Sequence, residues 1–323
     1  EVRWTHQGEV PSCPQGSEPS VTMGVSMTIL LKRICGLALA LAVVSSVGCS
    51  QTKRDAIAVM NAGVKSFEKK DFKTAYAHFK RSVEISDDNP GSYYHLGQID
   101  LYQHEDLVKA REHLEKARDL SSQDKVLLKN ILLHLGRLSL KEQKFEEAVK
   151  RCEDAIALDP NFALAWYFKG EAHYGKGNFD DADAAWRESI QIAPTEPRAF
   201  SALGQLYVRF ERFEAAKAVY KEGLKHLPGN VELREGLGVR QLEENLPKDA
   251  IESFRAVLGA RPTRATSLYS LAVAYQRDGR LLEAHDWLGR YLDVVGDTGQ
   301  GGGPDLEAAR AFYELLEDEL PVQ

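Results

Sequence analysis

A pattern that recurs along the chain at a constant spacing constrains its fold more than any other feature. Between Ala163 and Pro228 the pattern occurs twice, with the same residue or the same kind of side chain at each matched position. The members of each matched pair are 34 positions apart: Trp166 and Phe200, Gly170 and Gly204, Ala182 and Ala216, Trp186 and Tyr220, and Pro194 and Pro228. A constant period of this length predicts a stack of similar supersecondary units, each of which buries its apolar face against the next unit.

The same register extends in both directions and defines seven units. Each unit has one small residue in a first predicted helix and another in a second predicted helix. The small residues are Gly63, Gly97, Gly136, Gly170, Gly204, Gly238 and Ala272 in the first helices, and Ala75, Ala110, Ala148, Ala182, Ala216, Ala250 and Ala284 in the second. Small residues let two helix backbones approach closely, and proline after the second helix ends it. The pattern therefore predicts an all-α chain of paired helices.

The spacing of the small residues departs from 34 once, between Gly97 and Gly136, which are 39 positions apart. One extra residue falls before Ala110, where we expect the turn near residues 103–106 to be one residue longer. The other four fall near residues 121–124, where we expect a longer loop or an added helical turn. A tolerated surface insertion is the favoured interpretation, and a hinge is the alternative.

The repeated positions resemble those of the tetratricopeptide repeat (TPR), which has an aromatic residue, Leu-Gly, Tyr, Ala, a second aromatic residue and Pro at fixed spacing. The fifth unit matches best, with Phe200, Leu203-Gly204, Tyr207, Ala216, Tyr220 and Pro228. The resemblance implies a TPR α-solenoid over residues 56–295, in which about seven helix-turn-helix repeats form a right-handed superhelix.

Two segments follow the repeats. Residues 296–303 are rich in glycine and predict a flexible linker. Residues 304–321 carry an apolar stripe at helical spacing, and we expect this C-terminal helix to cap the last repeat. The alternative is a helix that detaches to bind a partner.

The first part of the chain predicts export. Residues 1–26 have no periodicity, and we interpret them as a disordered extension or a start-site artefact. Residues 27–48 place Lys32-Arg33 before an uncharged, mostly apolar run over 34–47. Such a run is short for a membrane span and typical of a signal peptide.

Small residues precede Cys49, and this arrangement resembles the lipobox of bacterial lipoproteins, although Ser46 replaces the leucine favoured there. The resemblance implies acylation of Cys49, for example by palmitate, and a lipidated tether over residues 49–55. Ser50 resembles the residue that directs enterobacterial lipoproteins to the outer membrane. We therefore expect an envelope protein that is anchored by lipid, in the outer membrane facing the periplasm. The alternatives are an uncleaved signal anchor, or cleavage that leaves Cys49 free.

Composition and motifs argue against catalysis and against nucleic-acid binding. The chain has 41 Lys+Arg against 48 Asp+Glu and a formal net charge of −7, whereas a nucleic-acid surface needs clustered basic residues. We find no phosphate-binding loop, nucleophile motif or metal-ligand spacing. Cys152 is the one cysteine after Cys49, and we expect it to be a small buried hydrophobic residue. We predict that the chain is not an enzyme and needs no cofactor or metal.

The resemblance also implies a binding surface, because positions two, five, nine and twelve of each TPR face a concave groove. Transferring these positions gives Tyr94, Gln98, Asn130, Leu133, Arg137, Tyr167, Glu171, Tyr174, Arg198, Ser201, Gln205, Glu232, Glu235, Tyr269, Val273 and Gln276. Tyrosine, arginine and glutamine are typical of a surface that binds a protein or an extended peptide. The alternative for the tyrosines is half-buried packing.

Two functions agree with these features. The first is a lipid-anchored scaffold that mediates protein–protein interaction at the periplasmic face of the envelope. The alternative is an assembly factor, because the chain also resembles repeat lipoproteins that pilot secretins in type IV pili, secretion systems or polysaccharide export. Co-chaperones of the TPR family bind a terminal carboxylate through Lys and Asn at positions five and nine. Those residue types are absent here, so we do not expect binding of chaperone tails.

Overall fold

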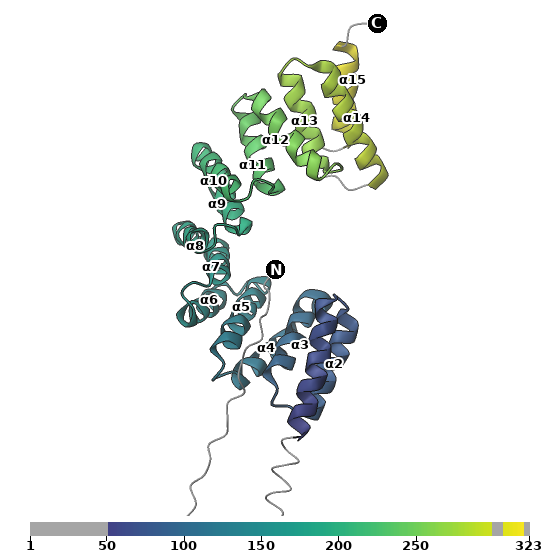
Figure 1. Ribbon diagram of the computed structural model, residues 1–323. Helices are drawn as coiled ribbons and strands as arrows, with labels where there is room; N and C mark the ends of the chain where they lie inside the picture. Colours follow the sequence, from purple (N-terminus) through teal and green to yellow (C-terminus); the bar gives the residue numbers. More distant parts are fainter. Residues whose placement is uncertain (1–50, 299–305, 320–323) are drawn as a thin grey trace, which may run out of the picture. The chain divides into compact units, whose positions relative to one another are not determined.

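The computed structural model describes residues 51–298 and 306–319 of the chain. Across these residues the chain is almost entirely helical and contains no strand (Figure 1). The first described helix covers residues 51–68, and it is followed by α2 (Phe72–Ile85), α3 (Pro90–Ile99), the π-helix η1 (Asp100–His104), α4 (Leu107–Leu120), α5 (Lys125–Lys141), α6 (Phe145–Leu158), α7 (Ala163–Lys176), α8 (Phe179–Ile192), α9 (Pro197–Arg209), α10 (Phe213–His226), α11 (Val231–Glu243), α12 (Pro247–Ala260), α13 (Ala265–Arg277), α14 (Leu281–Thr298) and α15 (Leu306–Glu319).

The helices form seven pairs, which are the predicted repeat units. Residues 56–68 of the first described helix pair with α2, and the other pairs are α3 with α4, α5 with α6, α7 with α8, α9 with α10, α11 with α12, and α13 with α14. By its internal contacts the chain divides into residues 1–55 and 56–323, and the packing described below lies within the second part. The two helices of a pair pack together, and the second helix packs against the first helix of the next pair. The all-α TPR α-solenoid is therefore confirmed.

First helices of neighbouring units also contact each other directly. Such contacts join α3 to α5, α5 to α7, α9 to α11 and α11 to α13, whereas α7 and α9 are joined mainly through α8. Side chains on the first helices of successive units therefore come close to one another, and this places the predicted binding positions on one set of adjacent helices.

The glycines of the first helices lie where a second helix approaches most closely. A Cβ atom added to Gly97 would lie 2.6 Å from Cγ of Leu114, and one added to Gly204 would lie 2.3 Å from Cε1 of Tyr220. Real Cβ atoms do not approach other atoms so closely, because the interior is already packed to near crystal density. The predicted reason for small residues at these positions is thus confirmed.

The five extra residues between Gly97 and Gly136 are accommodated within helices. One forms part of η1, which extends α3 through π-type turns before Glu105 ends it in a left-handed conformation (φ 54°). The predicted longer turn near residues 103–106 is therefore wrong, because a helix absorbs a single inserted residue as a π-bulge without losing its hydrogen bonds. The other four lie at the start of α5, which begins 11 residues before Gly136, whereas α7 begins 7 residues before Gly170. This agrees with the expected added turn.

The last helix, α15, packs against α14 and closes the final repeat. Ala309 and Leu316 are fully buried, and Phe312 and Tyr313 pack against the same apolar cluster. This agrees with the predicted capping helix. The neighbouring boundaries differ in detail from the predicted ones: α14 continues to Thr298, into the segment predicted as a linker, and residues 299–305 lie outside the described residues.

Candidate functional site

Four of the predicted groove residues line one cavity between α9, α11 and α13. Ser201 and Gln205 come from α9, and Glu232 and Glu235 come from α11. The cavity has a volume of about 440 Å³, and its other lining residues are Val208, Tyr220, Gly236, Val239, Arg240, Arg264, Thr266 and Ser270. We call it the groove cavity. Its lining is mixed, with hydroxyl, amide, carboxylate and guanidinium groups beside aliphatic and aromatic surface.

Within the groove cavity, Glu235 is already saturated with hydrogen bonds. Arg264 donates to its carboxylate from Nε at 2.9 Å and also from Nη2, and the hydroxyls of Thr266 and Ser267 each donate at 2.6 Å. Burial alone would raise the pKa of Glu235, but these donors outweigh it and lower the pKa. Glu235 therefore fixes α11 to the start of α13, and Glu232, Ser201 and Gln205 remain as the accessible polar groups.

A second group of predicted residues lies on α7. Tyr167 and Glu171 are half-buried, and the exposed Arg198 of α9 lies over the Tyr167 ring at 5.5 Å. Burial raises the pKa of Glu171, and a hydrogen bond from the Tyr167 hydroxyl offsets only part of that rise. No lysine, arginine or histidine among the described residues forms an ion pair with Glu171. Its carboxylate is thus available to a positively charged or hydrogen-bond-donating group.

Between α3 and α5, the predicted residues belong to a buried polar network. The Gln98 amide donates to the Tyr94 hydroxyl at 3.0 Å and lies 3.0 Å from Nε2 of His134, and the Tyr102 hydroxyl lies 2.8 Å from Nδ1 of His134. His95 contacts the Gln98 carbonyl oxygen through Nδ1 at 2.9 Å. Sequence reasoning missed His95, Tyr102 and His134 because they do not occupy groove positions.

The network requires a neutral imidazole at position 134. The Gln98 amide nitrogen is a donor, so Nε2 of His134 must accept, and the proton of the neutral ring then sits on Nδ1 and is donated to Tyr102. Protonating Nε2 would set two donors against each other in a site that excludes water. Burial and the nearby Arg137 lower the pKa of His134 to about 3, and burial lowers the pKa of His95 to about 4.

The remaining predicted groove residues make packing contacts. Leu133 is buried in the apolar cluster with Ala155 and Ala165, and Asn130 donates to the carbonyl of Val126 in its own helix at 2.8 Å. Others pack around aromatic rings or lie half-buried: Arg137 lies over Tyr102 and Phe168, Tyr174 accepts a hydrogen bond from Arg209, Tyr269 contacts Tyr291 and Phe312, and Val273 and Gln276 are half-buried.

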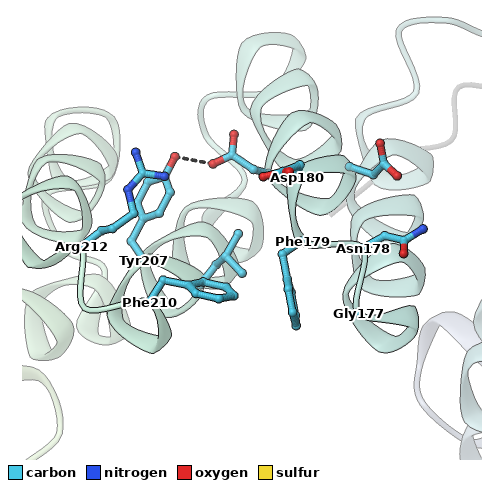
Figure 2. A pocket seen from close by; sticks show the side chains of 10 residues that line it. Gly177, Asn178, Phe179, Asp180, Tyr207, Phe210 and Arg212 are labelled. Atoms are coloured by element: carbon cyan, nitrogen blue, oxygen red, sulfur yellow. Dashed lines mark hydrogen bonds between the residues drawn. The ribbon is translucent and has the colours of Figure 1, made fainter.

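A larger cavity, of about 720 Å³, lies away from the predicted groove residues. It is lined by the turn before α8, the start of α8, the end of α9 and the turn after it: Gly177, Asn178, Phe179, Asp180, Asp181, Asp183, Leu206, Tyr207, Phe210 and Arg212 (Figure 2). We call it the turn pocket. The sequence assigned none of these residues to a site, although one signal was present: Phe210 occupies the register position of Lys176 and Glu244, where the neighbouring units carry a charge.

The structure also bears on the predictions about Cys152, about metal binding and about the membrane. Cys152 is buried as predicted, and burial raises the pKa of its thiol to about 12. In the described part of the chain, no cluster of three or more His, Cys, Asp or Glu residues is arranged to hold a metal ion. No helix within residues 51–298 or 306–319 is both long and apolar enough to cross a membrane. Cys49 and the predicted leader lie outside the described residues.

Comparison with known proteins gives the same fold. The chain is 24% identical over 247 residues to the TPR repeat-containing protein MJ1428 of Methanocaldococcus jannaschii, covering 73% of this chain and 42% of that protein. It is 30% identical over 185 residues to Hsp70-Hsp90 organizing protein 1 of Glycine max, covering 57% and 30%. The chain thus spans less than half the length of either relative.

Among solved structures, yeast Tom70 has a similar fold, with a TM-score of 0.56 and 17% identity, over 83% of this chain and 55% of that one. A family model described as the tetratricopeptide repeat matches residues 133–197, 201–265 and 237–297. Together these matches cover about half of the chain. The chain therefore belongs to the tetratricopeptide-repeat family.

Proposed function

We propose that this chain is a scaffold that binds an extended segment of a protein partner along the first helices of its repeats. The observation that carries this proposal is the groove cavity, which brings together residues of α9 and α11 that the repeat register had placed on one surface, beside residues of α13. The accessible groups there, on Ser201, Gln205 and Glu232, can accept or donate hydrogen bonds to a peptide backbone and its polar side chains. In this proposal the chain binds a partner and catalyses no reaction.

The charged residues on the first helices indicate which charge the bound segment of the partner carries. In the groove cavity Glu235 is paired with Arg264, and Glu232 is paired with Arg261 at 3.0 Å, whereas Glu171 on α7 has no ion-pair partner among the described residues. A terminal carboxylate would meet repulsion at Glu171, whereas lysine, arginine or a neutral polar residue would not. This supports a segment that is neutral or basic, and it disfavours the carboxylate-terminated tails bound by co-chaperones of this family.

Photo-crosslinking tests the groove directly. A photoreactive phenylalanine analogue placed at Gln205, which is exposed in the groove cavity, is expected to yield a discrete adduct with a partner protein in intact cells. The matched control carries the analogue at Lys221, which is exposed on the second helix α10 of the same unit. Adducts of equal yield and pattern from both positions would contradict groove binding.

We further propose that the scaffold is anchored by lipid at Cys49, in the bacterial outer membrane facing the periplasm. The support is the sequence: a basic pair, an apolar run and small residues lead to Cys49. Several acyl chains would hold the protein firmly, since each buried methylene contributes about 0.8 kcal/mol. Cys49→Ala is expected to move the protein from the membrane fraction to the soluble fraction. If the variant stays in the membrane fraction and still carries lipid, the anchor is elsewhere.

The alternative function is assistance in assembling a secretin, a type IV pilus, a secretion system or a polysaccharide-export complex. Its support is the combination of a predicted lipoprotein leader with a repeat array in one chain. Affinity purification from detergent-solubilised membranes separates the two functions. Enrichment of a single pore-forming protein would favour an assembly factor, and several unrelated partners would favour a general scaffold.

A further inference from the structure

The residue at the end of the first helix is charged in most units. In five consecutive units this register position holds Glu142, Lys176, Phe210, Glu244 and Asp278. Four of the five are charged, and Phe210 is the exception. Phe210 is nonetheless 47% exposed, so that an aromatic ring meets solvent where the other four of these units present a charge.

In other units the charged residue pairs with the second helix of the preceding unit. Glu142 pairs with Arg111 of α4 at 2.5 Å, Lys176 with Glu146 of α6 at 3.6 Å, and Glu244 with Lys217 of α10 at 2.5 Å. These ion pairs bridge three unit junctions in the same place. At these three junctions the position supplies a charge that pairs with the preceding second helix, whereas Asp278 forms no ion pair with the described residues.

At the junction of α8 and α9, the preceding helix presents the carboxylate of Asp180, which Phe210 cannot neutralise. In the repeat register Asp180 is equivalent to Glu146, and Asp183 is equivalent to Lys217. Asp180 is exposed and forms no ion pair with the described residues, while Asp183 pairs with Arg187 of its own helix at 2.6 Å. Phe210 instead contacts Phe179 edge-on, with ring centroids 4.9 Å apart.

The turn pocket opens at this junction. Figure 2 shows the Phe179 and Phe210 rings side by side at its base, with Asp180 above them and Tyr207 and Arg212 on the opposite wall. Two other arginines at this junction contact aromatic residues. Arg212 lies over the Tyr207 ring at 4.9 Å, and Arg209 donates to the Tyr174 hydroxyl at 2.8 Å while it lies over Phe179.

We propose that the turn pocket is a second docking surface, which receives a lysine or arginine of a protein partner and packs an adjacent apolar side chain of that partner against Phe210 and Phe179. The partner's cation replaces the charge that the repeat register omits at position 210. Aromatic rings beside the carboxylates also favour a cation, because the ring faces carry partial negative charge. The turn pocket shares no lining residue with the groove cavity, so both surfaces can be occupied at the same time.

The experiment selects short random peptides displayed on phage against the full chain. We expect the retained peptides to pair lysine or arginine with a neighbouring large apolar residue. Phe210→Lys, which supplies the cation internally as Lys176 does for Glu146, is expected to weaken their binding about tenfold or more, a change of about 1.4 kcal/mol. Replacing the basic residue of such a peptide by glutamine should weaken binding to the wild-type chain by a similar factor.

Two controls separate this proposal from groove binding and from misfolding. Gln205→Trp, in the groove cavity, should leave these peptides bound, whereas peptides held in the groove should be lost with Gln205→Trp and kept with Phe210→Lys. Phe210→Lys should retain the wild-type helical circular dichroism. The proposal is overturned if no basic, apolar peptides are retained, if they bind Phe210→Lys equally well, or if the wild-type chain self-associates through this surface and the variant is monomeric.

Discussion

Acidification between about pH 7 and pH 5 is expected to destabilise the chain by about 4 kcal/mol through His95 and His134. In the unfolded chain both imidazoles take up a proton near their ordinary pKa of 6.5, whereas burial holds the folded pKa of His134 at about 3 and that of His95 at about 4. The unfolded state therefore binds more protons throughout this range. Each histidine lowers the free energy of unfolding by about 1.4 kcal/mol for every pH unit below 6.5, until its folded pKa is reached.

Urea denaturation followed by circular dichroism, at several pH values in this range, measures the effect. His134→Gln should reduce the pH dependence by about half, because one of the two buried imidazoles is removed. The matched control is His226→Gln, since His226 is exposed on α10. A pH dependence that is the same in the wild-type chain and in His134→Gln would contradict the role of the buried network. Above about pH 5 most carboxylates remain ionised, so they contribute little to the difference.

Gly170→Ala is expected to destabilise the chain by about 1–3 kcal/mol, although alanine is the better helix former. A Cβ atom at position 170 would lie 2.5 Å from both Cδ1 and Nε1 of Trp186. The indole cannot move away easily, because it is 2% exposed and its Nε1 donates to the Tyr167 carbonyl at 3.1 Å. The added methyl group must therefore push α7 and α8 apart.

Gly259→Ala is the matched control for this prediction. Gly259 is also helical, in α12, but no atom lies within 4 Å of a Cβ atom added there. This substitution should be neutral or stabilising by up to about 1 kcal/mol, since only the helix propensity changes. Thermal denaturation of the two variants compares them directly. Equal effects would show that the close approach of Trp186 does not determine the choice of glycine at position 170.

The repeat register predicted the fold almost completely, because each unit needs the same small and large residues to pack two helices. Gly170 and Gly204 have the predicted close neighbours, and the added turn at the start of α5 is one of the two outcomes predicted for the four extra residues there. The insertion before Ala110 could not be placed in the same way. A longer turn and a π-helix use the same number of residues, and the choice depends on which inward contacts the extra residue makes.

The candidate site was predicted in part. The register identified Ser201, Gln205 and Glu232, which line the groove cavity. It could not show that Glu235 is saturated, because the donor Arg264 belongs to the next unit and reaches back to it. The turn pocket arises from a single departure from the repeat, Phe210, and such departures have meaning only once the usual role of the position is known from the structure.

The inserted residue in the π-helix η1 links the second unit to a buried histidine of the third unit. One inserted residue rotates every later side chain of that helix by about 100°, and Tyr102 and His104 follow the point of insertion. In the rotated phase Tyr102 reaches His134, and His104 donates to the buried Asp100 at 2.9 Å. A related chain that lacks the insertion would present different side chains inward at this junction. The insertion and the buried histidine are therefore expected to be inherited together, and to be lost together.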